Sequence, residues 1–364
     1  MPFPDLWSAC VAVSPADDPA LRALFWPFHN AALVLPAAPV LFLGARIGDW
    51  PFVHPHVTWR CEQPFLPFAR PLRERGIEVE PQLRDTGFAM TLLLPPRQRD
   101  ASRALLARAL TATAPGGWIV AAATNNEGAR SLEADLRALA GPVQSLSKHK
   151  SRVVFVRVDP DNCDARLHEE WRALDALREV QSGDERFWTR PGLFAWDRVD
   201  PASALLASEL PAGLRGRVAD PGGGWGYLSM QLLRRCAGIE TLDLFEADAR
   251  ALDAAQRNLD ATRSTPAAQV ACRVHWHDVS AGLPGQFDVI VSNPPFHLGR
   301  ADAPQLGRSF IASAADALAD DGQIWLVANR HLPYEELLRE RFSQVRMPVQ
   351  RDGYKILHAC GVKR

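Results

Sequence analysis

The residues best suited to chemistry are Asn293, Pro294, Pro295 and Phe296, which directly follow the apolar segment 288–292. Proline cannot donate to a sheet, so the two prolines end a strand at its carboxyl edge, where open α/β sheets bind ligands. The Asn293 side-chain oxygen and the Pro294 carbonyl can accept two hydrogen bonds, and Phe296 can stack on a flat ring. This set suits the exocyclic amino group of a nucleobase. The alternative is an ordinary strand that ends in a turn.

A glycine-rich segment lies upstream, where Asp220, Gly222, Gly224 and Gly226 follow a short apolar strand and precede leucines with helical spacing. Glycines let the backbone turn sharply and approach a ligand, and the start of a helix adds N–H groups that face the same ligand. The spacing does not match the Gly-x-Gly-x-x-Gly pattern of nicotinamide-binding proteins. It resembles the first motif of S-adenosylmethionine-dependent methyltransferases, so we expect S-adenosyl-L-methionine as the cofactor.

Two acidic residues, Glu246 and Asp278, follow the next two expected strands. An acid at the distance of Glu246 past a glycine loop commonly binds ribose hydroxyls, and Asp278 is placed to accept a hydrogen bond from the adenine amino group. Asp248 is a rival for the ribose, but we interpret it as the N-cap of the following helix. Each acid alone is typical of a solvated loop or a cap. The glycine loop, Glu246, Asp278 and the segment that begins at Asn293 follow successive strands, and together these four features favour a methyltransferase. We also assign Asn293 to the cofactor site.

The sequence from about residue 190 onward resembles the bacterial ribosomal RNA guanine-N2 methyltransferases, with the small-subunit type ahead of the large-subunit type. The stretches that carry the resemblance are 192–200, 220–226, 293–297 and 327–334. The last stretch and His297 separate this family from the DNA amino-methyltransferases and the protein glutamine methyltransferases, which share Asn-Pro-Pro-aromatic. Pro221 departs from the aliphatic residue that is usual in the family; it stiffens the loop without blocking binding.

The resemblance implies S-adenosylmethionine-dependent methylation of the exocyclic N2 amino group of a guanine in ribosomal RNA. Asn293 and the Pro294 carbonyl would accept the two amino hydrogens, and Phe296 would stack on the base. His297 would bind the substrate RNA or accept the released proton; the alternative is a structural neighbour of the loop. The amino group lies on the pairing edge, so the base must be unpaired or flipped. Phe194 and Trp196 either close over the adenosine or the base, or are core aromatics. Amino methylation of adenine or of protein glutamine remains open, as does a non-catalytic RNA-binding or assembly protein.

The first half of the sequence repeats the second in outline, which indicates a gene duplication. An apolar strand ends in Pro95-Pro96, and Leu94 stands where Asn293 does; segment 44–50 takes the place of the glycine loop without a preceding acid. We therefore expect an α/β protein with two tandem Rossmann-like class I methyltransferase folds. Each would have a mostly parallel sheet that is closed by a C-terminal antiparallel hairpin. Two unrelated α/β domains are the alternative.

These patterns predict three regions: a degenerate methyltransferase-like domain over 1–159, a linker over 160–188, and a catalytic domain over 189–364. The linker is charged and is expected to be helical around Leu167–Val180. The first domain would recognise the RNA or another part of the substrate. The candidate RNA-binding residues on it are Lys148, Lys150 and Arg152.

Composition is compatible with this interpretation. The 364 residues are 47% hydrophobic, which is enough for two cores, and the net charge of −1 confines any RNA-binding surface to a local patch. The six cysteines lack paired spacing, and His275 and His277 lack a third ligand, so we expect neither disulfides nor a metal site. We see no signal peptide and no membrane-spanning stretch. We expect a cytoplasmic monomer whose partner is ribosomal RNA or a small-subunit assembly particle.

Overall fold

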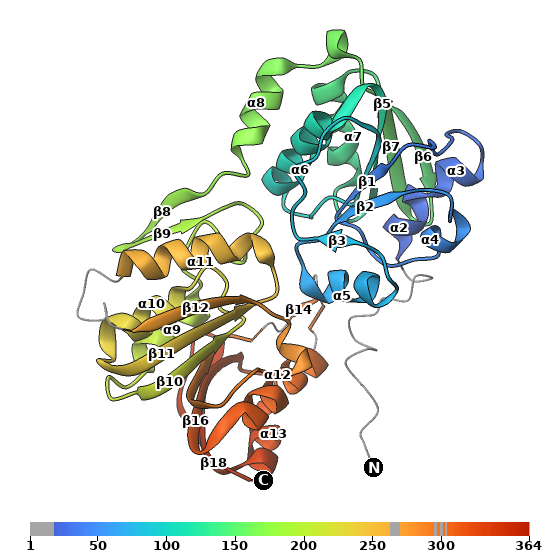
Figure 1. Cartoon of the computed structure of the whole chain (residues 1–364). Coiled ribbons are helices and arrows are strands. Elements are labelled where there is room, and N and C mark those ends of the chain that lie inside the picture. The colour runs from blue at the N-terminus through green and yellow to red at the C-terminus, as the bar shows by residue number, and fades with distance from the viewer. Residues whose placement is uncertain (1–17, 263–269, 295–296, 299–300, 303, 364) are drawn as a thin grey trace. The chain divides into compact units, whose positions relative to one another are not determined.

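The computed structural model of the chain describes residues 18–262, 270–294, 297–298, 301–302 and 304–363, and between residues 297 and 306 it describes the backbone alone. The chain folds into two compact units (Figure 1). Within the described residues, the N-terminal unit comprises residues 18–176 and 190–192, and the C-terminal unit comprises residues 177–189 and 193–363.

The N-terminal unit contains a sheet of seven strands: β1 (Val40–Leu43), β2 (Trp59–Glu62), β3 (Val79–Glu80), β4 (Phe88–Leu93), β5 (Thr113–Thr124), β6 (Gln144–Lys148) and β7 (Ser151–Arg157). Their order is β3-β2-β1-β4-β5-β7-β6. The strands pair in parallel except that β7 is antiparallel to both β5 and β6. The helices are α2 (Pro19–Leu24), α3 (Trp26–His29), α4 (Trp50–Val53), α5 (Leu66–Glu74), α6 (Arg99–Ala112), α7 (Ala129–Ala140) and α8 (Ala165–Ala173).

The C-terminal unit contains a second sheet of seven strands: β10 (Arg215–Pro221), β11 (Gly238–Glu246), β12 (Ala271–Trp276), β13 (Phe287–Ser292), β16 (Leu318–Asn329), β17 (Phe342–Arg351) and β18 (Tyr354–Val362). Their order, β12-β11-β10-β13-β16-β18-β17, repeats that of the first sheet, with β18 antiparallel to its neighbours. The helices are α9 (Pro201–Glu209), α10 (Tyr227–Arg235), α11 (Ala249–Thr262), α12 (Pro304–Ala317) and α13 (Tyr334–Arg341). Two short hairpins complete the unit: β8 (Arg178–Ser182) with β9 (Glu185–Thr189), and β14 (His297–Leu298) with β15 (Ala301–Asp302).

The two sheets share details beyond strand order. The pair β4–β5 and the pair β13–β16 contain the same register shift, two residues after β4 and β13 begin. Counting along the strands from this shift places Leu94 at the position of Asn293, as the sequence predicts. The turns that join the last two strands also match, since His149 and Asp352 both have positive φ, of 53° and 55°. The expected pair of tandem Rossmann-like folds is therefore confirmed.

Apolar side chains cover both faces of the C-terminal sheet. Leucines of α9, α10 and α11 pack on one face against alternate residues of β10, β11 and β13. The other face is covered by α12 and α13, whose core includes Phe310, Ile311 and Leu338. Successive side chains of a strand point to opposite faces, so a strand that is buried on both faces needs apolar residues on each of them. The loops after the parallel strands are thereby held at one edge of the sheet.

The segment 160–188, expected to be a linker, is folded and divided between the units. Helix α8 belongs to the N-terminal unit, where Trp171 is 2% exposed and lies in the core beneath α6 and α7. The helix expected around Leu167–Val180 is wrong beyond Ala173, because residues 178–182 form β8 and pair with β9 in the C-terminal unit. Charged and polar residues on both strands conceal the period of two that marks a hairpin.

Candidate active site

The glycine-rich loop follows β10 and leads directly into α10, at the carboxyl edge of the C-terminal sheet. Gly222, Gly224 and Gly226 have φ values of 72°, 56° and 93°, a region that favours glycine. A Cβ atom added at Gly224 would meet no atom within 4 Å, so this glycine borders open space. The glycine backbone turns sharply here and leaves room beside it, so a cofactor can approach the backbone closely.

Asp220, near the end of β10, is fully buried. Its Oδ2 accepts hydrogen bonds from the Ser229 N–H (3.1 Å) and the Ser229 hydroxyl (2.6 Å), which tie the strand to α10. Its Oδ1 is also buried and has no hydrogen-bond partner among the described residues. Burial raises the pKa of Asp220 to about 6, although the hydrogen bonds from Ser229 oppose the shift. A buried carboxyl group with one unused oxygen fits a cationic or N–H group of a bound cofactor.

Glu246 ends β11 and reaches the glycine loop. Its Oε2 accepts a hydrogen bond from the Gly224 N–H (2.9 Å), and its Oε1 accepts one from the Asp248 N–H (2.8 Å). Burial raises the pKa of Glu246 to about 7, and the negative charge of Asp248 adds to the shift. Glu246 therefore borders the same open space as Gly224, where a carboxylate can accept hydrogen bonds from ribose hydroxyls.

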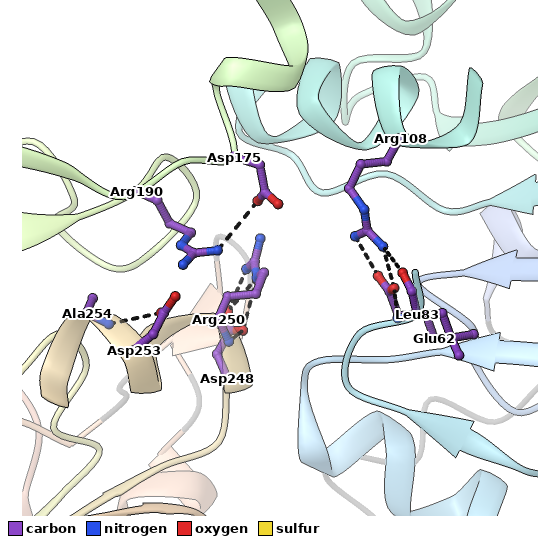
Figure 2. Close-up of polar contacts among 9 residues, drawn as sticks. All are labelled: Glu62, Leu83, Arg108, Asp175, Arg190, Asp248, Arg250, Asp253 and Ala254. Carbon is purple, nitrogen blue, oxygen red and sulfur yellow. Dashed lines mark hydrogen bonds and ion pairs between the residues drawn. The ribbon is translucent and has the colours of Figure 1, made fainter. Parts of the chain in front are cut away.

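Asp248, the alternative ribose ligand, makes its side-chain contacts with Arg250, two residues further along the chain. It directly precedes α11, and its Oδ1 accepts a hydrogen bond from the Arg250 N–H (3.0 Å), as an N-cap residue does. Its carboxylate also binds the Arg250 guanidinium, with a closest distance of 2.5 Å (Figure 2). These contacts support Glu246 over Asp248 as the acid available to a ligand.

Asp278 is 4% exposed and caps a short 3-10 helix, η4 (Val279–Ala281). Its Oδ1 accepts hydrogen bonds from the Ser280 N–H (3.0 Å) and the Ser280 hydroxyl (2.5 Å). The structure places Asp278 after β12, at the sheet edge that also carries Asp220 and Glu246. Its contact with adenine stays a prediction, because capping alone accounts for the contacts that we observe.

Asn293 follows β13 and is half-buried. Its Nδ2 donates to Asp200 Oδ2 (3.0 Å) and to Ser203 Oγ (2.8 Å). An ionised carboxylate only accepts hydrogen bonds, so Asp200 fixes which end of the amide faces it. The acceptor oxygen, Oδ1, is consequently turned away from Asp200 and Ser203. This is the oxygen that the sequence predicts as an acceptor for the amino group of a base.

Asp200 and Ser203 belong to the site, although neither stands out in the sequence as a ligand of Asn293. Asp200 is the N-cap of α9, where its Oδ2 accepts a hydrogen bond from the Ser203 N–H (2.8 Å). The pattern Asp-Pro-x-Ser signals such a cap, and the cap brings both side chains to Asn293. The contact spans 93 residues of sequence, so no local pattern could reveal it.

The remaining residues of the expected catalytic motif are only partly described. Pro294 is buried, whereas Phe296 lies outside the described residues. His297 begins β14, and its backbone alone is described. The roles expected for the Pro294 carbonyl, Phe296 and His297 therefore stay predictions.

An aromatic cluster supports the glycine loop from the side of β9. The ring of Trp225, which is 4% exposed, stacks on Phe187 with centroids 3.9 Å apart and planes inclined by 7°. Asn258 on α11 donates to the Trp225 carbonyl (2.7 Å) and to the Trp188 carbonyl (2.9 Å). The loop is thus fixed to both the hairpin and α11, which restricts the motion of its backbone N–H groups.

Phe194 and Trp196 differ in their surroundings. Phe194 is 67% exposed, which is unusual for a large apolar side chain and leaves it available to a ligand. Trp196 is half-buried beside the core cluster that includes Trp225, and the Arg178 guanidinium lies 5.2 Å from the centre of its ring. Phe194 is therefore the better candidate for stacking, and Trp196 is a packed aromatic.

The three expected RNA-binding residues of the N-terminal unit lie on the β6–β7 hairpin but are not equivalent. The Lys148 Nζ lies 4.5 Å from the centre of the Trp26 ring, and Lys150 is exposed in the turn with φ of 55°. Arg152 is bound to Glu133 at 2.5 Å. Lys148 and Lys150 thus present charge to solvent, whereas the charge of Arg152 is compensated within the fold.

The N-terminal unit replaces two acids of the C-terminal site with uncharged residues. The strand registers place the buried Phe42 at the position of Asp220 and Gln63 at the position of Glu246. Gln63 retains the geometry of Glu246: its Oε1 accepts from the Phe65 N–H (3.0 Å), two residues on. Its Nε2, however, donates to the loop carbonyl of Ala45 (2.7 Å), where Glu246 accepts from a loop N–H. An uncharged amide therefore stands where the C-terminal unit has the carboxylate of Glu246.

An arginine stands at the position that corresponds to Gly224. The same count places Arg46 at this position, where its guanidinium binds Asp18 (2.8 Å) and lies 5.2 Å from the centre of the Phe68 ring. Asp18 is the N-cap of α2, as Asp200 is of α9. The N-terminal copy therefore keeps the N-cap aspartate of the site but carries a bulky cationic side chain in place of Gly224.

The carboxylate of Glu62, the residue before Gln63, is hydrogen-bonded to other protein groups. Figure 2 shows its bidentate pair with Arg108, at 2.8 and 2.5 Å, and its contact with Leu83, whose N–H donates at 2.7 Å. Both oxygens of Glu62 are used, and the residue is 2% exposed. Glu62 is therefore bound within the fold by an arginine and is not available to a ligand in the way that Glu246 is.

His275 and His277, which have the spacing of a metal-ligand pair, contact protein groups instead. His275 binds Asp243 (2.6 Å), and His277 contacts the Gly282 carbonyl (2.6 Å). In the described residues, no group of three or more His, Cys, Asp or Glu side chains could hold a metal ion. Among these same residues, every helix is too short or too polar to cross a membrane.

Similarity to known proteins extends over both units. Residues 184–358 match the family model described as methyltransferase small domain. The ribosomal RNA small subunit methyltransferase C of Shewanella amazonensis is 28% identical over 273 residues, which cover 75% of this chain and 77% of the relative. The protein of that name from Psychromonas ingrahamii is 25% identical over 273 residues, which cover 75% and 76%.

A solved structure matches both units. It is that of the T. thermophilus 16S rRNA N2 G1207 methyltransferase (RsmC) in complex with AdoMet and guanosine. The match has a TM-score of 0.78 at 25% identity and covers 95% of this chain and 93% of that chain. Similarity over nearly the full length of both chains means that the duplicated architecture, and not the C-terminal unit alone, is shared.

Proposed function

We propose that this chain, which belongs to the methyltransferases of ribosomal RNA, transfers a methyl group from S-adenosylmethionine to the N2 amino group of a guanine in small-subunit ribosomal RNA. The observation that carries the proposal is Asn293, whose amide is held by Asp200 and Ser203 so that Oδ1 is presented as an acceptor. It lies at the sheet edge that carries the glycine loop, Asp220 and Glu246.

The cofactor supplies an electrophilic methyl group on a sulfonium. We assign its binding to the backbone around Gly222, Gly224 and Gly226, and its ribose to Glu246. The unused Oδ1 of Asp220 fits a donor group on the cofactor, and Asp278 is assigned to the adenine. These residues would hold and orient the cofactor at the sheet edge that also carries Asn293.

The nitrogen of the guanine amino group is a weak nucleophile because its lone pair is delocalised into the ring. Asn293 Oδ1 and the Pro294 carbonyl would accept its two hydrogens and direct the nitrogen toward the methyl group. As positive charge develops on nitrogen in the transition state, these oxygens stabilise it. Alignment of the nitrogen with the methyl group would contribute further to the rate. The N–C bond would form as the S–C bond breaks, so the demethylated thioether would be the leaving group, and the methylated nitrogen would lose one proton to solvent or to His297. Phe296 and His297 are assigned to the base and the neighbouring RNA.

The test is methyl transfer by the full chain to small-subunit particles from a strain that lacks this protein. Labelled cofactor followed by nuclease digestion and mass spectrometry should yield N2-methylguanosine at a single position. Asn293→Ala should abolish most of the label, whereas Asn125→Ala, in an exposed turn of the N-terminal unit, should not. Label on adenine or on protein glutamine would support amino methylation of another target, and binding without label would support a non-catalytic RNA-binding protein.

The same experiment addresses the form of the substrate and of the enzyme. Comparing naked ribosomal RNA with assembled particles tells which of them is methylated. We propose that the chain acts as a monomer in the cytoplasm, where its substrate is assembled. Sedimentation of the purified chain should give a mass near 40 kDa; the sequence mass is 40.1 kDa.

A further inference from the structure

A hollow of about 350 Å³ opens in the N-terminal unit between α2, α3, α4 and the β6–β7 turn. It adjoins the segment 44–50, which takes the place of the glycine loop, because Gly48, Asp49 and Trp50 are among its lining residues. Its polar and aromatic lining includes Arg22, Trp26, His29, Trp50, His54 and His149. Pockets of this size accept a small flat ligand.

The hollow exists because the helix after the first strand is short in this unit. Helix α4 has 4 residues, whereas α10, in the same place in the C-terminal unit, has 9. Pro51 lies at the start of α4, and Pro55 follows just beyond its end, where it disfavours continuation. In α10, Leu228, Leu232 and Leu233 pack into the core with α9. In the N-terminal unit, aromatic and imidazole side chains line the corresponding space instead of a row of leucines.

The aromatic walls suit a planar ring. Phe25 and Trp50 lie parallel, with planes inclined by 3° and centroids 5.9 Å apart, and form a rigid floor. Trp26 is half-buried, with His29 nearly parallel to it at 13° and the Lys148 Nζ 4.5 Å from the centre of its ring. Aromatic side chains that are fixed on one side and open on the other are the usual platforms for unpaired bases.

The histidines add hydrogen-bonding groups. The Nε2 of His54 is buried and has no hydrogen-bond partner among the described residues. Burial lowers the pKa of His54, and the neighbouring His29 and His56 lower it further. The pKa of His149 is lowered by burial and then by Arg22 and Lys148. Neutral imidazoles offer one donor and one acceptor each, which matches the mixed edge of a base.

Positive charge borders the hollow. Lys148 and Lys150 flank His149 in the β6–β7 turn, and both are exposed. Arg22 is an exposed lining residue, and Asp49 is the carboxylate among the lining residues. Bases and phosphates occur together in RNA, so an aromatic pocket with a basic border matches a nucleotide within a strand.

We propose that this hollow binds one unpaired nucleotide of the RNA substrate, with the base against Trp26 and His54 and the flanking phosphates at Lys148 and Lys150. The proposal rests on the proposed function for the identity of the RNA. The N-terminal unit would then grip single-stranded RNA while a separate guanine is methylated at Asn293.

The test measures RNA affinity without cofactor, so it can be interpreted even if methyl transfer fails. The full chain is titrated at 0.15 M salt with a fluorescent single-stranded oligoribonucleotide and with the same sequence as a duplex. We expect Trp26→Ala to weaken single-strand binding about tenfold, which is about 1.4 kcal/mol. Lys148→Glu together with Lys150→Glu should weaken it more and reduce its salt dependence. Ultraviolet crosslinking and peptide mapping should place a nucleotide on the segment that contains Trp26 or His54.

Arg166→Ala is the matched control, since it removes an exposed cation from α8, which contributes no residue to the lining. It should leave the affinity unchanged. Equal single-strand affinity in the wild type, Trp26→Ala and His54→Ala, with circular dichroism showing that all are folded, would overturn the proposal. So would tighter binding of the duplex than of the single strand. Displacement of the oligonucleotide by a lower concentration of free guanosine monophosphate would make the hollow a mononucleotide site and would likewise overturn the RNA assignment.

Discussion

Asp200 Oδ2 accepts a hydrogen bond from Asn293 Nδ2 at 3.0 Å and one from the Ser203 N–H at 2.8 Å. One carboxylate oxygen therefore caps α9 and orients the side-chain amide of Asn293. The N-cap fixes Asp200, and Asp200 in turn fixes Asn293, so the acceptor is oriented before the base arrives. Such preorganisation avoids reorganisation at the moment of reaction.

The first prediction separates these two roles of Asp200. Asparagine is as good an N-cap as aspartate, so Asp200→Asn should retain the melting temperature. It should lower kcat about tenfold, because a neutral amide no longer dictates how Asn293 is turned, while KM and cofactor affinity change little. Asp164→Asn is the control, since Asp164 caps α8 through the Leu167 N–H (2.8 Å). Equal kcat in Asp200→Asn and Asp164→Asn would reduce Asp200 to a helix cap.

The second prediction concerns Asn293 itself. Asn293→Ala removes one of two acceptors aimed at the reacting amino group, so the loss should appear in kcat, on the order of 100-fold or more. Calorimetry should show nearly unchanged affinity for S-adenosylmethionine, because the proposed mechanism directs Asn293 Oδ1 at the base and not at the adenosine. Single-turnover kinetics with assembled small subunits measures the chemical step. A wild-type rate for Asn293→Ala would contradict the mechanism without contradicting the methyltransferase assignment.

The third prediction concerns the glycine loop. Gly224→Asp places a carboxylate in the open space beside Glu246, whose Oε2 is 2.9 Å from the Gly224 nitrogen. The two negative charges and the filled space should abolish cofactor binding in calorimetry. Gly353→Asp is matched for strain, since φ is 84° there and a Cβ atom meets nothing within 4 Å. Loss of binding in both variants would mean that strain, and not the site, is responsible.

The sequence predicts what depends on local order, and it does not reveal what depends on distant partners. Glycines, acids and prolines at strand ends predict the sheet, its carboxyl edge and the candidate ligands, because each strand carries its own signal. The contact of Asn293 with Asp200 joins residues 93 positions apart, and that of Arg152 with Glu133 crosses from β7 to α7. Neither leaves a pattern in the sequence. The hairpin β8–β9 escapes prediction for a different reason, since charged and polar residues surround the few apolar residues of its strands, such as Val180 and Phe187.

The fourth prediction follows from the pair of Arg152 and Glu133. Burial of Glu133 opposes ionisation, but hydrogen bonds from Arg152 and Arg137 lower its pKa below the ordinary value. The pair therefore stabilises the fold above the unfolded pKa of about 4.5, and the contribution is lost as pH falls through the lower folded pKa. Arg152→Ala should reduce the free energy of unfolding by roughly 1 kcal/mol at pH 7 and by less at pH 3.

The contrast with the neighbouring lysines makes that prediction specific. Because its charge is compensated, Arg152→Ala should leave the salt dependence of RNA binding unchanged. Lys148→Ala and Lys150→Ala should each reduce the slope of log affinity against log salt by about 0.7 per lost phosphate contact. Urea unfolding and fluorescence titrations at several salt concentrations provide both readouts. A reduced slope for Arg152→Ala with unchanged stability would reverse the assignment.

The fifth prediction is a pH dependence of cofactor affinity. Burial raises the pKa of Glu246 to about 7 and that of Asp220 to about 6 in the free protein. Ribose hydroxyls donate to the ionised form of Glu246, so binding must remove its proton at lower pH. Affinity for S-adenosylmethionine should therefore rise from pH 5 to pH 8, about tenfold per unit below the pKa of a group that must ionise.

Two variants separate the two carboxyl groups. Glu246→Gln should bind weakly and lose the step near pH 7 but retain any step near pH 6. Asp220→Asn should lose any step near pH 6 and retain the step near pH 7. Isothermal calorimetry in buffers of different ionisation heat counts the released protons directly. If wild-type affinity is flat from pH 5 to pH 8 and no protons are released, neither carboxyl group titrates with the cofactor, and the assignment of Glu246 to the ribose fails.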